Sequence, residues 1–183
     1  MKTGRKLVLL RTKIEQISYK KIVLLIVILK VTISFIFIGF ILLANILLNL
    51  QLENYFQNLN SDFPTKNAII ATISALILAP IIETSIFQHL IFQFLKVIRQ
   101  TGVPIMYITI SSLLFGLAHQ AVWTTGPFLG IVSFIHKVVG GIMLAISYYI
   151  FYRKREHAML STALIHAVHN AAIVLPVIII ANL

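Results

Sequence analysis

The chain has 183 residues, of which 59% are hydrophobic and 11% are charged, and its mean hydropathy is +0.97. Soluble globular domains are about 45–50% apolar and about 25% charged, so these few charges could not cover a soluble surface. The net charge of +10 comes from basic residues scattered between long apolar runs, which argues against nucleic-acid binding and indicates membrane topology instead.

Five apolar segments have a length suited to crossing a bilayer, which takes about 20 apolar residues in a helix. In chain order they are residues 22–50, 68–95, 103–119, 128–152 and 158–183. The first carries Lys30 near its start, where a long side chain can reach back to the interface. The third begins beside Pro104, a residue favoured in a first helical turn. The sequence therefore predicts an all-α, polytopic transmembrane helical bundle of about five spans.

The basic residues orient these spans, because positively charged loops stay in the cytoplasm. Seven of the fifteen Lys and Arg residues precede the first span, two follow the second and three follow the fourth. The loops on the opposite side contain only Lys66. We therefore expect a cytoplasmic N-terminus, with residues 1–21 as a basic cytoplasmic segment and residues 22–183 as a single transmembrane domain in contact with the lipid bilayer.

Ionisable side chains inside the predicted spans are candidates for function, because burying a charge in hydrocarbon is costly. Of the five acidic residues, only Glu83 falls within a span. The other polar candidates in the spans are His89, His119, His136, Lys137, His166, His169 and Asn170. A histidine buried between membrane helices usually makes an interhelical hydrogen bond, and we expect that structural role for His89, His136 and His169.

Spacing along the helices places some of these residues together. His166 and Asn170 are four residues apart and share a helical face, as do Phe115 and His119. Whether residues from different spans meet depends on how the helices tilt.

Pro80 lies three residues before Glu83 and removes one backbone donor. A kink there can open a hydrated pocket beside the carboxylate, because the freed carbonyl needs a partner. The rise of 1.5 Å per residue places Glu83, Asn170 and the two histidines at depths that differ by up to about 12 Å. They can therefore converge only if the helices tilt or if the helix ends differ from the predicted ones by a turn.

If the four side chains converge, one carboxylate and two imidazoles can activate a water molecule, directly or through a metal such as zinc. The carboxylate would serve as general base, and an amide can donate to the oxyanion of a tetrahedral intermediate. This set of groups suits peptide-bond hydrolysis. A proton-coupled transporter also uses buried Glu and His, but it predicts repeated halves, which this sequence lacks. The absence of cysteine excludes a cysteine nucleophile.

Three stretches carry a family resemblance: APIIETSIFQHLIF (79–92), SSLLFGLAHQ (111–120) and LSTALIHAVHNAAIVL (160–175). In this order they resemble the motifs EExxxR, FxxxH and HxxxN/D of the CAAX protease and bacteriocin-processing (CPBP/Abi) family of intramembrane proteases. The resemblance covers roughly residues 68–176, which we expect to form a protease-like core.

The resemblance implies a role for each matching residue. Glu83 would activate the attacking water, His119 and His166 would be catalytic, and Asn170 would support the oxyanion. Phe115 completes the second motif beside them. If the family uses zinc, its ligands here would be the two histidines with Glu83. The implied substrate is a membrane-associated peptide or protein, in bacteriocin maturation or self-immunity at a bacterial plasma membrane.

Two positions depart from the first motif. Its second glutamate is Thr84 here and its arginine is Gln88. Glutamate and arginine four residues apart would pair on one helix, so losing both avoids leaving a buried charge unpaired. Thr84 and Gln88 could form a neutral hydrogen bond instead. We expect the pair to support the site, so that the enzyme stays active with reduced or altered specificity. The alternative is a catalytically degenerate membrane protein that acts as an immunity factor or scaffold.

Overall fold

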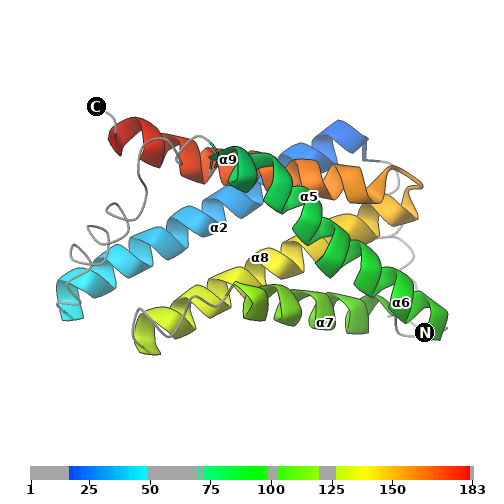
Figure 1. Cartoon of the computed structure of the whole chain (residues 1–183), viewed down its shortest axis with the longest axis horizontal. Helices are drawn as coiled ribbons and strands as arrows, with labels where there is room; N and C mark the ends of the chain where they lie inside the picture. Colours follow the sequence, from blue (N-terminus) through cyan, green and yellow to red (C-terminus); the bar gives the residue numbers. More distant parts are fainter. Residues whose placement is uncertain (1–16, 49–69, 71, 99–102, 120–126, 182–183) are drawn as a thin grey trace.

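The computed structural model describes residues 17–48, 70, 72–98, 103–119 and 127–181 (Figure 1). Most of the predicted basic segment 1–21 lies outside these residues. The described part is helical and contains no strand. It comprises α2 (Tyr19–Leu48), η1 (Ser74–Leu78), α5 (Ala79–Glu83), η2 (Thr84–Leu90), α6 (Ile91–Ile98), α7 (Val103–Ala118), α8 (Pro127–Arg153) and α9 (Ala158–Ala181).

These elements form five helical rods, because η1, α5, η2 and α6 follow one another without a break. The prediction of an all-α bundle is confirmed: the described residues form five helical rods, three of which are long and apolar enough to cross a membrane. Tyr19–Leu48, Ser74–Ile98 and Gly130–Arg153 are long and apolar enough to cross a membrane. The helices at Val103–Ala118 and Ala158–Ile173 are apolar but shorter.

The second rod alternates between π-helix and α-helix around Pro80. Proline has no N–H to donate, so an ordinary α-helical ladder cannot continue through it. The chain widens just before it: the N–H of Ala79 donates to the carbonyl of Ser74, five residues back. A second π-helical stretch, η2, follows Glu83 directly. Glu83 thus lies between two π-helical segments, which are rare and often occur at functional sites.

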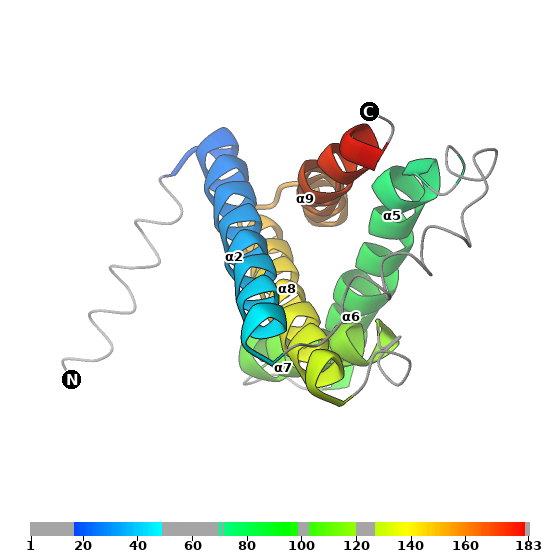
Figure 2. The ribbon, with the colours of Figure 1, turned by 90° about the vertical axis from the view of Figure 1, so that its left-hand side faces the viewer.

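Helix α8 is the central element and contacts all four other rods (Figures 1 and 2). Its approach to α7 depends on glycine. A Cβ built on Gly141 would lie 2.9 Å from the Cα of Ser112, and one on Gly116 would collide with Val138. A side chain at either position would push α7 and α8 apart, which would move the end of α7.

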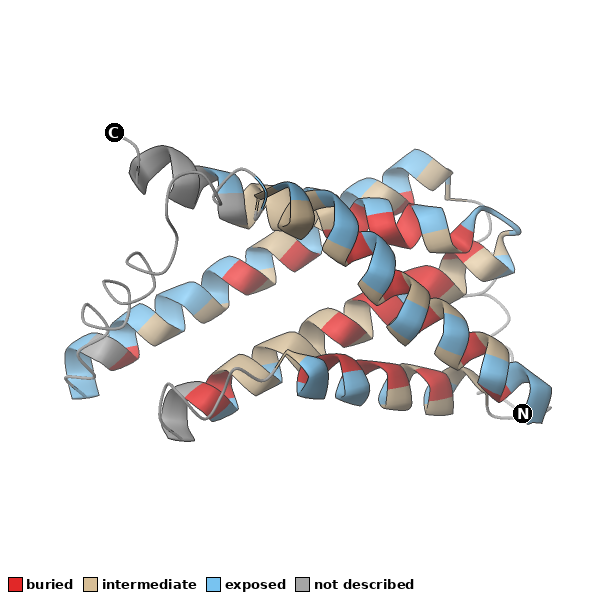
Figure 3. Ribbon diagram, in the orientation of Figure 1, coloured by how far each residue is buried: buried red, intermediate tan, exposed pale blue. Residues whose placement is uncertain are grey.

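Buried positions gather where the rods cross, whereas the outer faces are exposed and apolar (Figure 3). The aromatic core includes Phe92, whose ring lies 5.0 Å from Tyr107 and 5.4 Å from Tyr148. On the outside, Val97 is 85% exposed and Ile46 is 77% exposed. Exposed apolar faces of this extent are stable against lipid rather than water.

Candidate active site

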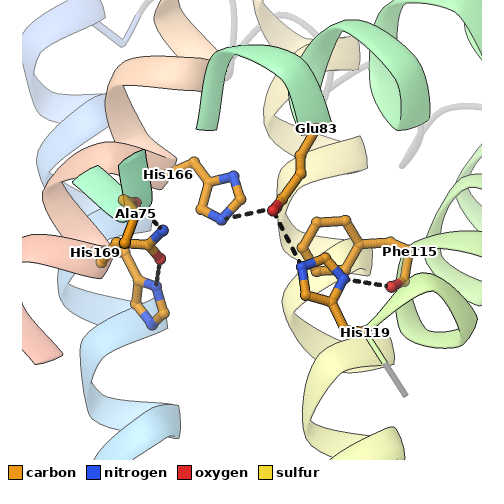
Figure 4. Close-up of polar contacts among 7 residues, drawn as sticks. Ala75, Glu83, Phe115, His119, His166 and His169 are labelled. Carbon is orange, nitrogen blue, oxygen red and sulfur yellow. Dashed lines mark hydrogen bonds and ion pairs between the residues drawn. The ribbon is translucent and has the colours of Figure 1, made fainter. Parts of the chain in front are cut away.

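Glu83 ends helix α5 and contacts histidines from two other rods (Figure 4). Its Oε1 lies 3.2 Å from Nε2 of His119, which directly follows α7. Its Oε2 lies 3.6 Å from Nε2 of His166 on α9. The predicted meeting of one carboxylate with two imidazoles from three helical rods is present in the structure.

The end of α7 fixes the orientation of His119. The last four carbonyls of a helix have no partner within it, and Phe115 provides one of these carbonyls. Nδ1 of His119 donates to that carbonyl oxygen at 2.7 Å. The Phe115 ring also lies against the imidazole, with centroids 4.3 Å apart. Phe115 therefore holds the His119 ring with both its backbone and its side chain.

This orientation determines how Glu83 and His119 interact. A carbonyl can only accept, so Nδ1 of His119 carries a proton and Nε2 is the nitrogen that faces Glu83. A carboxylate oxygen and a bare imidazole nitrogen are both acceptors, so the contact at 3.2 Å requires a proton between them. Glu83 and His119 thus form a pair that shares one proton.

His166 is the more enclosed histidine, with 6% of its side chain exposed against 23% for His119. Nε2 of His166 lies 3.6 Å from Oε2 of Glu83, which is too far for a good hydrogen bond. This nitrogen is therefore available to bond the oxygen atom of a ligand beside the carboxylate. Nδ1 of His166 is buried and has no hydrogen-bond partner among the residues that the structure describes. The centroids of the Phe115 and His166 rings are 5.8 Å apart, so the Phe115 ring lies near both histidines.

Asn170 lines the same cavity but does not touch Glu83. Its Nδ2 donates to the carbonyl of Ala75 in η1 at 3.0 Å, and its Oδ1 lies 3.4 Å from Nδ1 of His169. An amide nitrogen has two N–H groups, so one stays available to a ligand in the cavity.

The cavity around these residues has a volume of about 390 Å³ and is also lined by Ser34, His136 and His169. The sequence predicts only a structural role for these two histidines. Ser34 lies between two histidines: its Oγ is 3.1 Å from Nε2 of His136 and 2.8 Å from Nε2 of His169. The interhelical hydrogen bonds expected for these histidines are present, and so is one between His89 and Tyr148 at 2.7 Å.

Lys30 and Lys137 line this cavity as well. Lys30 is only 3% exposed, so its expected reach to the interface is wrong. Its position within α2, about 17 Å along the helix from Tyr19, places it against the other rods. The sequence gives no periodic signal that could have placed a lysine of the first span in the cavity.

The hydrogen bond suggested for Thr84 and Gln88 is not formed. Both residues are fully buried, yet Oγ1 of Thr84 and both polar atoms of Gln88 have no partner within the described part of the chain. They lie in η2, whose π-helical bonds span five residues. Residues four apart therefore do not stack as they would in an α-helix.

Glu83, His119 and His166 have the donor types that zinc prefers. However, the described residues include no group of three or more His, Cys, Asp or Glu side chains with the spacing to hold a metal ion. The geometry therefore does not fit zinc, and we assign no step to it. Zinc binding stays a prediction from the sequence.

Comparison with known proteins supports the sequence resemblance. A family model described as type II CAAX prenyl endopeptidase Rce1-like matches residues 65–172. This range includes Glu83, His119, His166 and Asn170 and covers more than half of the chain. No curated protein and no solved structure matches it.

Proposed function

Because the chain belongs to the type II CAAX prenyl endopeptidase Rce1-like family, we propose that it is an intramembrane endopeptidase that uses Glu83, His119, His166 and Asn170. It would hydrolyse a peptide bond in a membrane-associated peptide or protein. The observation that carries this proposal is the contact of both Glu83 carboxylate oxygens with histidines from two other rods.

The proposed reaction begins with a water molecule bound beside Glu83. The carboxylate accepts a proton from the water as its oxygen attacks the carbonyl carbon of the substrate. His166 Nε2 and the free N–H of Asn170 are suited to donate to the oxyanion that forms. The C–N bond then breaks, and the proton shared by Glu83 and His119 goes to the leaving nitrogen. Glu83 then returns the water's proton to His119, and the products are a new carboxyl group and an amine.

A second cavity, lined by residues of the two helices that provide Glu83 and His166, supports a membrane-associated substrate. It has a volume of about 540 Å³ and is lined by Pro80 and Ile81 of α5, by Leu164 of α9 and by neighbouring side chains, most of them apolar. A lipid-like or apolar part of a substrate would be stable there. The family description names CAAX prenyl substrates. For this chain we propose a membrane-associated peptide in bacteriocin maturation or self-immunity at a bacterial plasma membrane, with the N-terminus in the cytoplasm.

The experiment is a cleavage or immunity assay that compares the wild-type chain with Glu83→Ala and His166→Ala. Both variants should lose function while they remain in the membrane at wild-type levels. General acid–base catalysis contributes roughly a hundredfold to ten-thousandfold, so the loss should be large. Retained function in both variants would contradict the proposal.

One observation favours the alternative of a degenerate immunity or scaffold protein. Thr84 and Gln88 replace the charged motif residues and leave three buried polar atoms without partners in the described chain. These atoms lie beside the proposed catalytic residues rather than among them, so the peptidase remains the better supported function. Retained immunity without cleavage in the Glu83→Ala variant would favour the alternative.

A further inference from the structure

Two lysines lie in the cavity of the proposed active site, although neither belongs to a family motif. Lys30 comes from α2 and Lys137 from α8, so they reach the cavity from separate rods. Lys30 is 3% exposed and therefore has little contact with the outside of the protein. An ammonium group is rarely buried at this depth unless it is paired or lines a functional cavity.

Neither lysine has a hydrogen bond or an ion pair within the described residues. The acidic side chains of that part of the chain are Glu83 and Glu156, and Glu156 lines the other cavity. One carboxylate oxygen of Glu83 contacts His119 and the other contacts His166. Two ammonium groups therefore share one cavity with a single carboxylate that is already engaged, which leaves an excess of positive charge.

The surroundings of the lysines are polar and ordered. Ser34 lies one turn after Lys30 on α2 and bonds His136, the residue next to Lys137. Ser34 also bonds His169, which leads to Asn170. His136 and His169 are thus joined through Ser34. The ammonium groups of Lys30 and Lys137 are the charged donors beside them that have no partner within the described residues.

We propose that Lys30 and Lys137 bind a carboxylate of the peptide substrate and so position the peptide bond beside Glu83. This proposal rests on the proposed peptidase function. A carboxylate would balance the excess charge and form charge-assisted hydrogen bonds in a site of low dielectric. Since a single cavity of about 390 Å³ contains both the lysines and Glu83, the carboxylate must lie close to the bond that is cut. It can be the free C-terminus of the substrate or an acidic side chain.

The test measures binding to the Glu83→Gln variant in lipid nanodiscs, so that cleavage does not interfere. The probe is a fluorescent farnesylated peptide that ends in a CAAX sequence, prepared with a free C-terminal carboxylate and with a C-terminal amide. We expect the amide to bind roughly tenfold to a hundredfold more weakly by fluorescence anisotropy. A third probe, an amide whose last residue is glutamate, separates the two sources: recovered affinity indicates a side chain, and no recovery indicates the C-terminus.

Lys30→Met and Lys137→Met should each reduce the preference for the acid over the amide, while affinity for the amide stays unchanged. Lys20→Met is the matched control, because Lys20 is an exposed residue of the same helix. It should keep the full preference. If acid, amide and glutamate-amide probes bind the Glu83→Gln protein equally, the proposal is overturned, whatever the lysine variants do.

The two proposals can fail separately. If wild-type protein cleaves the acid probe but the three probes bind Glu83→Gln equally, the carboxylate site is wrong and the peptidase stands. If the acid is preferred through both lysines but no probe is cleaved by the wild type, the carboxylate site stands and this result counts against the peptidase.

Discussion

The imidazole of His119 is bonded through Nδ1 to the carbonyl oxygen of Phe115 at 2.7 Å, one helical turn earlier in the chain. The same bond completes the end of α7 and turns Nε2 toward Glu83. The FxxxH motif thus has a local explanation: the spacing of four residues lets the helix end orient the histidine.

His119 and His89 offer a direct comparison of a proposed catalytic histidine with a structural one. His119→Ala should lower cleavage roughly a hundredfold to ten-thousandfold, because it removes a partner that shares a proton with Glu83. His89→Ala removes a hydrogen bond to Tyr148 and should reduce thermal stability with little effect on cleavage per folded molecule. Equal activity in the two variants would show that the two histidines were assigned the wrong roles.

Thr84 and Gln88 can be converted to the charged residues of the family motif. If they only support the site, the double variant Thr84→Glu with Gln88→Arg should cleave at a rate similar to that of the wild type. Thr84→Glu alone should reduce stability, because it buries an unpaired charge in a fully buried position. A wild type without activity and a double variant with activity would show instead that this chain is a degenerate family member.

Neighbouring glycines in α8 provide a matched test of helix packing. Gly141→Ala should destabilise the protein by about 1–3 kcal/mol, because its Cβ would meet the Ser112 backbone of α7. Gly140→Ala should be neutral or slightly stabilising, since a Cβ there meets nothing within 4 Å. Thermal unfolding in detergent compares them, and equal melting temperatures would contradict the close approach of α7 and α8.

Chelation separates the two forms of the hydrolytic mechanism. The contact between Glu83 and His119 supports proton transfer without a metal, and the spacing of the described residues does not fit one. We therefore expect cleavage to survive dialysis against 1,10-phenanthroline, with less than one equivalent of zinc by mass spectrometry of the purified protein. Loss of activity that added zinc restores would instead support the prediction of a zinc site.

The predicted orientation can be tested with introduced cysteines, because the chain has none of its own. With a cytoplasmic N-terminus, Lys66→Cys should react with an impermeant maleimide added outside intact cells. Arg153→Cys should react only after the membrane is opened, since Arg153 ends α8 on the other side. The reverse pattern of labelling would mean that the chain is inserted in the opposite direction.

Hydrophobicity predicted the rods well. The span expected at 128–152 is the helix Pro127–Arg153, and the span expected at 103–119 is the helix Val103–Ala118. Long apolar runs form helices in lipid whatever their neighbours, because their backbone groups must bond within the segment. Glu83, His119 and His166 also met as expected. The spacing of four residues in the second and third motifs places Phe115 with His119, and His166 with Asn170, on one helical face.

The two misses have different causes. The role of Lys30 depends on how α2 lies against α8 and α9, which no spacing within one segment specifies. The failure of Thr84 to bond Gln88 follows from π-helical geometry, whereas the expectation assumed an α-helix. The first miss reflects the packing of separate rods, and the second reflects a local departure from the α-helix that the prediction assumed.

The two bonds of Ser34 give the hydrogen-bond chain a direction. Nδ1 of His169 donates its proton to the side-chain oxygen Oδ1 of Asn170, so Nε2 of His169 accepts the only hydroxyl proton of Ser34, and His136 must donate to that serine. Protons therefore point one way from α8 through α2 to α9, and their order keeps the amide nitrogen of Asn170 turned toward Ala75. Helix α2 lies outside the residues that the family model matches, so a fragment restricted to the matched residues would lose Ser34 and with it the direction of these hydrogen bonds.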